Sequence, residues 1–250
     1  MYIVGHSVMT ELAAPHRFDV FGDDVAALML PDIARCHDWG YDTCLDDRPV
    51  STAGELLRLH MLADWFIHFG EGTTRERSGW AYRKMGVYAR EYDAFFASAA
   101  ARGLREGPPG DSRRGFSHTM MEYSIDTWLI RNGHFEGRFR SVQDVLGRVG
   151  RGSGLVSVDW ARRTLAVAGA RSDSPDLAAD ALSFGERVLS SRGPEELVYR
   201  AGVKKFGLQD SDASVELMKA TLDEGLARIP DAELRLVVQE AAEFLSRRLA

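Results

Sequence analysis

Three residues that can bind a metal ion recur at intervals of four in the segment HMLADWFIHFG, residues 60–70. On a helix, His60, Asp64 and His68 would lie at about 0°, 40° and 80° around the axis, so all three side chains would project from one face. Imidazole and carboxylate groups gathered on one face can chelate a metal ion, and this stripe is therefore a candidate metal site.

Other segments add donors of the same kind. SHTMMEY places His118 and Glu122 one helical turn apart, VGHS contains His6, and LPDIARCHD contains Asp32 and His37. One such pair occurs often by chance, and a single buried histidine is more often a hydrogen-bonded core residue than a ligand. The recurrence favours a multinuclear metal site with the ligands His6, Asp32, His37, His60, Asp64, His68, His118 and Glu122. Mixed nitrogen and oxygen donors suit zinc, and also manganese or iron.

The order of these residues resembles that of the zinc-dependent phospholipase C family and its relatives, the single-strand-specific zinc nucleases. The resemblance covers residues 1 to about 130 and implies an all-helical fold that holds three zinc ions. It implies one metal held by Asp32, His37, His60 and Asp64, a second by His68, His118 and Glu122, and a third by His6 with Asp64 as a bridge.

The chain departs from the family at its first residue and in its ligand spacing. Family members use the amine and carbonyl of an N-terminal tryptophan as ligands, whereas this chain has Met1, so a third metal near Met1 is left open. The short interval from Asp32 to His37 leaves it open whether His16 replaces His37. Asp126 continues the stripe of His118 and is either a partner that orients an imidazole or an exposed helix carboxylate.

Hydrolysis of a phosphate ester is the reaction that the resemblance implies. Neighbouring metal ions lower the pKa of a water molecule and stabilise charge on a phosphoryl oxygen. The candidate catalytic residues are Asp32, which could accept a proton from the attacking water, and the bridging Asp64. Arg35, Arg113 and Arg114 lie near the ligands in sequence and are candidates for binding the phosphate, although each could equally be a solvated surface charge.

Apolar residues at helical spacing predict an all-α protein. We expect a helix at about 52–69 with Thr52 and Glu55 as a capping box and Gly70 at its end. A further helix should end at Gly103, and another should begin with Ser117 as its cap. The segments SVQDVLGRV, VDWARRTLAVAG, PDLAADALSFGERVLSS, DASVELMKATLDEGLARI and DAELRLVVQEAAEFLSRRL should also be helical. Residues 1–250 are expected to form one domain, with a metal-binding half at 1–134 and a packing half at 135–250.

Composition limits the partners and the compartment. The net charge of −6 gives no general attraction to nucleic acid or to anionic membranes. Neither a signal peptide nor a long apolar run is evident, and the two cysteines suggest no disulfide framework, so we expect a cytoplasmic protein. A small phosphorylated metabolite is the substrate that we favour, and the oligomeric state is open.

Other classes remain open from the sequence. An HD-type phosphodiesterase or an acyl-carrier-protein phosphodiesterase also uses histidine and aspartate, and the dipeptide His37-Asp38 keeps this class possible. A dinuclear iron or manganese oxygenase would normally contain repeated E-x-x-H pairs, and the sequence contains none. In a non-enzymatic alternative, the metals or the core histidines are structural and the helical C-terminal half binds a partner.

Overall fold

All the regular secondary structure is helical in the part of the chain that the structure describes. The computed structural model describes residues 2–35, 44–45, 51–76, 78–105, 112–149, 151, 157–170, 172 and 174–249, and none of these forms a β-strand. The helices are α1 Ile3–Ala13, α2 Val25–Leu28, α3 Leu30–Ala34, α5 Thr52–Phe69, α6 Trp80–Lys84, η1 Met85–Val87 (a 3₁₀ turn), α7 Glu91–Ala101, α8 Arg113–Arg131, α9 Phe139–Leu146, α10 Val158–Val167, α11 Leu177–Ser190, α12 Pro194–Lys205, α13 Asp212–Leu226 and α14 Asp231–Leu249. The all-α expectation is confirmed.

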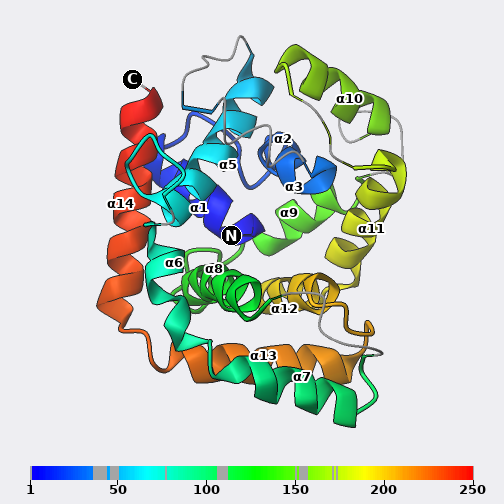
Figure 1. Cartoon of the computed structure of the whole chain (residues 1–250). Coiled ribbons are helices and arrows are strands. Elements are labelled where there is room, and N and C mark those ends of the chain that lie inside the picture. The colour runs from blue at the N-terminus through cyan, green and yellow to red at the C-terminus, as the bar shows by residue number, and fades with distance from the viewer. Residues whose placement is uncertain are drawn as a thin grey trace.

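Helices α5 and α8 lie inside the molecule and are covered by others. α5 packs against α1, α2, α6 and α14, and α8 packs against α1, α6, α12 and α13. Figure 1 shows α14 running along one edge, α7 and α13 lying across one end, and α11 and α12 on the side opposite α14. Because both central helices are covered on several sides, polar side chains on their inward faces, such as His60, Asp64 and Asp126, are buried and need polar partners.

The ends of α5 agree with the sequence-based boundaries, but its cap differs by one residue. Ser51, rather than Thr52, is the N-cap, and its Oγ accepts a hydrogen bond from the amide of Gly54. The carboxylate of Glu55 instead pairs with Arg17 on the surface. The helix stops at Gly70, whose φ of 77° is costly for residues with a side chain.

Three details of the other helices differ from expectation. α8 begins four residues earlier than Ser117, because the Oγ of Ser112 accepts the capping hydrogen bond from Gly115, and Ser117 lies inside the helix. The segment expected as one helix ending at Gly103 is divided into α6, η1 and α7. α12 was not expected, although Pro194 stands at a favourable first-turn position.

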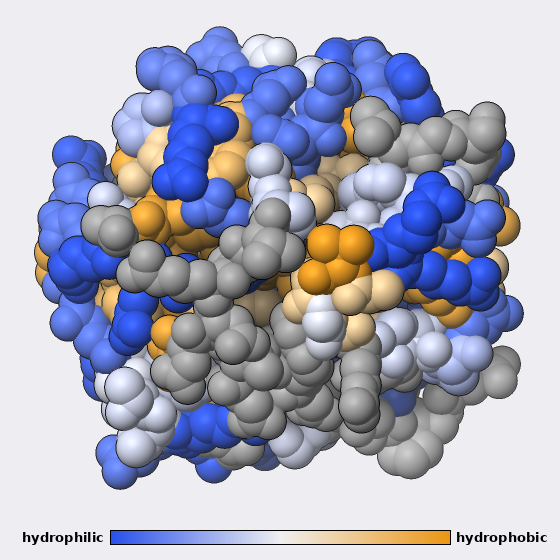
Figure 2. Space-filling view, turned by 90° about the horizontal axis from the view of Figure 1, so that it is seen from above, coloured by the Kyte–Doolittle hydropathy of each residue, from blue (hydrophilic) through white to orange (hydrophobic). Residues whose placement is uncertain are grey.

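Among the residues coloured in Figure 2, which views the molecule from above the orientation of Figure 1, hydrophilic ones predominate and hydrophobic ones lie between them. Within the described ranges, every helix is too short or too polar to span a lipid bilayer.

Candidate metal centre

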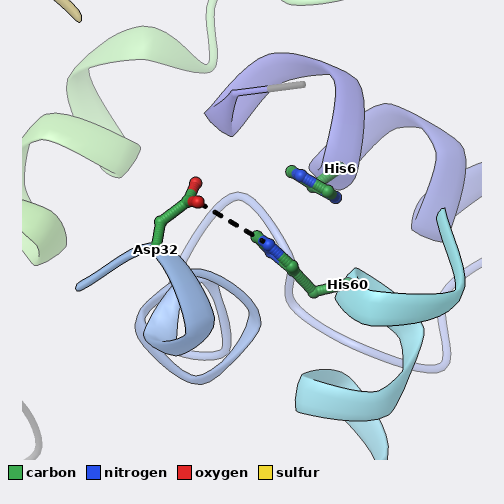
Figure 3. A group of neighbouring side chains, drawn as sticks. All are labelled: His6, Asp32 and His60. Atoms are coloured by element: carbon green, nitrogen blue, oxygen red, sulfur yellow. Dashed lines mark ion pairs between the residues drawn. The ribbon is translucent and has the colours of Figure 1, made fainter. Parts of the chain in front are cut away.

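The first group of candidate ligands is brought together by three helices. His6 comes from α1, Asp32 from α3 and His60 from α5, and one ligand atom of each lies within 4.8 Å of the others. Figure 3 shows the two imidazole rings lying over one another with the Asp32 carboxylate pointing toward His60. The ring centroids are 3.6 Å apart and the ring planes differ by 11°. Both histidines are completely buried.

Asp64 belongs beside this first group. Its Oδ1 lies 3.3 Å from Nε2 of His6, and its Oδ2 lies 3.6 Å from Nε2 of His60. The same His60 nitrogen lies 3.8 Å from Oδ1 of Asp32. One carboxylate therefore presents its two oxygens to two different imidazoles, an arrangement that suits a bridging ligand.

These distances fit shared coordination better than hydrogen bonding. A hydrogen bond between a ring N–H and a carboxylate is usually about 2.7–3.2 Å long. Two ligand atoms bound at about 2.1 Å to a tetrahedral zinc ion lie about 3.4 Å apart. The contacts of 3.3 to 3.8 Å among His6, His60, Asp32 and Asp64 are close to that spacing. The donor set and its spacing therefore fit a metal ion.

The second group joins the end of α5 to α8. His68, His118 and Glu122 place ligand atoms within 4.8 Å of one another. Because a carboxylate can only accept, Nε2 of His68 donates to Oε1 of Glu122 over 2.6 Å. Nε2 of His118 lies 3.7 Å from the same oxygen and has no hydrogen-bond partner among the described residues. Tyr82 stacks on the His118 ring with centroids 4.4 Å apart.

Burial and neighbouring charges favour the protonation states of His118 and Glu122 that can bind a metal ion. Burial lowers the pKa of His118 to about 4, against the opposing effect of Glu122, so the imidazole is neutral near pH 7. Burial alone would raise the pKa of Glu122, but the neighbouring His118 and His68 help to hold it well below its usual range. A neutral imidazole and an ionised carboxylate are both competent ligands.

Three hydrogen bonds that involve backbone groups hold the ligand-bearing helices in place. The carboxylate of Asp126 on α8 accepts hydrogen bonds from the amides of Tyr2 and Gly5, at 3.0 and 2.9 Å, and so fixes the first turn of α1 next to His6. Asp126 therefore acts on the backbone of α1, and neither the imidazole partner nor the exposed carboxylate considered from the sequence is found. At the end of α5, the amide of Gly79 donates to the carbonyl of His68 over 2.8 Å.

Both groups contribute to one pocket of about 640 Å³. Asp32 and Asp64 reach it from the first group, and His68, His118 and Glu122 reach it from the second. The remainder of the wall comes largely from α11 and α12, which belong to the C-terminal half of the chain. Ligands and wall together form a cavity in which a small molecule can approach both groups.

The structure separates the three candidate phosphate-binding arginines. Arg35 lines the pocket and donates to Oδ1 of Asp180 over 2.6 Å. Its backbone is in the left-handed region, with φ of 51°, which is uncommon for a residue other than glycine. Arg113 instead pairs with Asp93, and the exposed Arg114 lies over the ring of Tyr82. Neither Arg113 nor Arg114 is among the residues that line the pocket.

Several pocket residues were missed by sequence reasoning. They are Tyr2, Arg187, Lys204 and Lys205. No local motif marks the three cations, which follow the last histidine of the chain by about fifty residues or more. The periodicity of α11 indicates which residues face inward, but it does not indicate that the neighbouring surface is a pocket.

Three further sequence-based candidates do not enter the described site. His37, with the dipeptide His37-Asp38, lies outside the described residues, as does Met1. The His16 side chain is 93 % exposed and lies 3.7 Å from Glu11, so it does not take the place of His37 in either group.

Comparison with protein-family models, with curated proteins and with solved structures finds no match to this chain. The likeness to zinc-dependent phospholipase C therefore stays a prediction that rests on the order of the ligands.

Proposed function

We propose that the protein is a metal-dependent phosphoric ester hydrolase, either a phosphatase or a phosphodiesterase, that uses two or three zinc ions. Manganese or iron is compatible with the same donors. The observation that carries the proposal is that two groups of histidine and carboxylate side chains, from four helices, contribute to one pocket that also contains basic side chains.

Metal ions held there would supply electrostatic stabilisation to a phosphoryl oxygen and lower the pKa of an attacking water molecule. Asp32 is suited to accept a proton, because its side chain is 18 % exposed and lines the pocket, whereas the Asp64 side chain is only 5 % exposed. Asp64 contacts both His6 and His60 and is better suited to hold the ions. Arg35 can bind a phosphoryl oxygen at the same pocket.

The proposed substrate is a small phosphorylated metabolite, and the proposed compartment is the cytoplasm. The pocket volume fits a molecule of that size. The buried thiol of Cys44 is free, which fits a reducing compartment.

Metal analysis and turnover test this function together. We expect purified protein to contain at least two zinc equivalents and to hydrolyse p-nitrophenyl phosphate or bis(p-nitrophenyl) phosphate, with loss of turnover in chelator and recovery when zinc returns. His60→Ala and His118→Ala should each remove metal and lower turnover about a hundredfold or more. His16→Ala is the matched control, since its ring is on the surface.

Two results would overturn the proposal. Full metal content in both His60→Ala and His118→Ala would reject the metal centre. Bound metal without turnover across aryl, nucleotide and sugar phosphates would reject the hydrolase and leave the metal site alone.

A further inference from the structure

The wall formed by α11 and α12 brings an excess of positive charge into the pocket. Arg187 comes from α11, and Lys204 and Lys205 come from the end of α12. Asp180 is the acidic residue that α11 contributes, and it is already bound to Arg35 and to the hydroxyl of Ser174. Asp180 also attracts Lys204, but a single carboxylate beside Arg35, Arg187 and two lysines leaves this wall with a net positive charge.

The partly buried side chain of Arg187 is suited to bind an anion. Its side chain is partly buried, and its Nε is buried without a hydrogen-bond partner among the described residues. The guanidinium lies over the ring of Phe184, 5.5 Å from the centroid, which holds it against the wall. A buried donor that lacks a partner is costly, and an anionic ligand would remove that cost.

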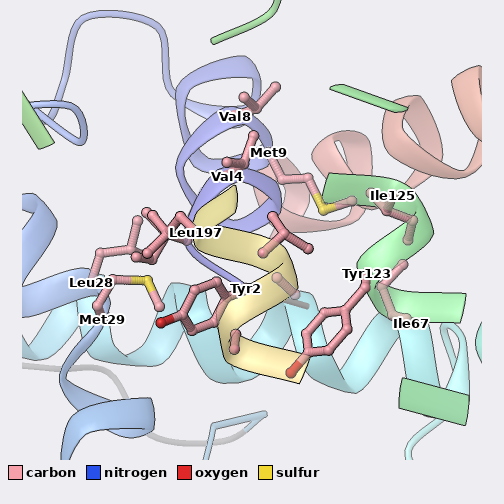
Figure 4. Close-up of a cluster of buried hydrophobic side chains, with 14 of the residues drawn as sticks. Tyr2, Val4, Val8, Met9, Leu28, Met29, Ile67, Tyr123, Ile125 and Leu197 are labelled. Atoms are coloured by element: carbon pink, nitrogen blue, oxygen red, sulfur yellow. The ribbon is translucent and has the colours of Figure 1, made fainter. Parts of the chain in front are cut away.

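A buried hydroxyl lines the pocket together with this arginine. Tyr2 is 6 % exposed, and its Oη has no hydrogen-bond partner within the described part of the chain. Figure 4 shows the hydroxyls of Tyr2 and Tyr123 on the side of the hydrophobic cluster away from Val8 and Met9. Burial raises the pKa of Tyr2 to about 12, so the hydroxyl keeps its proton and can donate a hydrogen bond to an anion.

Arg187 and Arg35 also affect the pKa of Lys204 on α12. Lys204 is exposed overall, yet its partial burial lowers the pKa of the amine; the guanidinium groups of Arg187 and Arg35 lower this pKa further, and Asp180 opposes them. Like charges are thus close enough to repel one another on this wall. An anion bound among them would relieve the repulsion as well as satisfy Arg187.

We infer that Tyr2, Arg187 and Lys204 form an anion subsite, and that the substrate carries a second anionic group besides the ester phosphate that is cleaved. The statement about substrate rests on the proposed hydrolase function, whereas the subsite itself is a binding property of the wall. The second group is a phosphate or a carboxylate, since Arg and Lys bind both.

Calorimetric titration of the zinc-loaded chain with three non-hydrolysable probes tests the subsite. Methylphosphonate has one anionic group, whereas methylenediphosphonate and phosphonoacetate each have two. We expect at least one of the two-group probes to bind about tenfold tighter than methylphosphonate. The probe that gains affinity distinguishes a phosphate from a carboxylate as the second group.

Substitutions test whether this gain in affinity comes from the wall formed by α11 and α12. Arg187→Gln should abolish the gain and leave methylphosphonate binding and zinc content unchanged, and Lys204→Gln, at an exposed position, should reduce it about threefold. Arg235→Gln, an exposed arginine on α14 outside the pocket, is the matched control. If the two-group probes still bind more tightly than methylphosphonate in Arg187→Gln, the gain in affinity comes from zinc chelation alone and the subsite is rejected. An equal loss of affinity for all three probes in Arg187→Gln would also reject the subsite.

The two proposals fail in different ways. Turnover of p-nitrophenyl phosphate without any gain that depends on Arg187 rejects the subsite and keeps the hydrolase. A gain that depends on Arg187 without turnover of any ester keeps the subsite and rejects the hydrolase.

Discussion

The imidazole rings of His6 and His60 are stacked 3.6 Å apart, although 54 residues separate them in the chain. Two protonated rings at this distance would repel each other strongly, so the stack favours neutral imidazoles, which are the form that binds metals. We therefore expect zinc to be released as the pH falls from about 7.5 to about 5, because protons compete for the imidazole ligands. Dialysis at each pH followed by elemental analysis measures this release.

The two ligand groups should lose metal separately. His6→Ala removes one ring of the stack and should lower zinc content while sparing the His68, His118 and Glu122 group. His134→Ala, which changes an exposed ring, is the control. An unchanged metal content in His6→Ala would contradict the assignment of the first group.

The raised pKa of Asp126 predicts that the free energy of unfolding depends on pH. Burial raises its pKa from 3.8 to about 6, against the hydrogen bonds from Gly5 and Tyr2. Between these values the folded chain binds the proton more tightly than the unfolded chain, so the contribution of Asp126 to stability is full below about pH 4 and falls as the pH rises to about 6. The difference in unfolding free energy between wild type and Asp126→Asn, measured with urea, should fall across that range and level off above it.

The same carboxylate should also matter for the metal centre. Asp126→Ala leaves the amides of Tyr2 and Gly5 without their acceptor, which we expect to cost about 1–3 kcal/mol of folding free energy. Because these amides fix the first turn of α1, zinc affinity at the His6 group should fall more than at the His68 group. Equal losses at the two groups would show that Asp126 acts only on global stability.

At Gly79, a single added methyl group should disturb His68. A Cβ there would overlap the backbone of Ile67 and His68, closer than van der Waals contact allows. We expect Gly79→Ala to destabilise the fold by about 1–3 kcal/mol and to weaken metal binding at the second group. Gly86→Ala, which meets no heavy atom within 4 Å, is the matched control and should change unfolding free energy little.

Cys44 should be chemically inert in the folded protein. Burial raises the pKa of its thiol to about 12, despite the nearby Arg58 and Arg248. The thiolate, which is the reactive form, is then scarce at neutral pH. In a Cys36→Ser background, a disulfide reagent should label Cys44 only at the rate of unfolding, or after denaturant is added. Rapid labelling of the native protein would contradict the burial of this residue.

The all-α class and the ligand stripe on α5 were predictable because both depend on local periodicity. The spacing of His60, Asp64 and His68 alone places them on one helical face. Grouping His6 with His60 depended on the resemblance to the ligand order of the zinc-dependent phospholipase C family, since no local pattern indicates that α1 contacts α5. The basic wall could not be predicted, because Arg187 and Lys204 become neighbours of the site only through packing between distant segments. Arg113 shows the converse, since it is close to His118 in sequence but pairs elsewhere.

Helix α1 packs closely against α14, and α1 carries His6. During synthesis, His6 emerges before α14, so the contact between α1 and α14 cannot form until the chain has grown through Asp231–Leu249. Contacts between such distant segments form slowly, because the intervening chain must first be ordered. Metal binding to the first group should therefore be among the last events of folding, and the rate at which refolding chains take up zinc would report on the docking of these two helices.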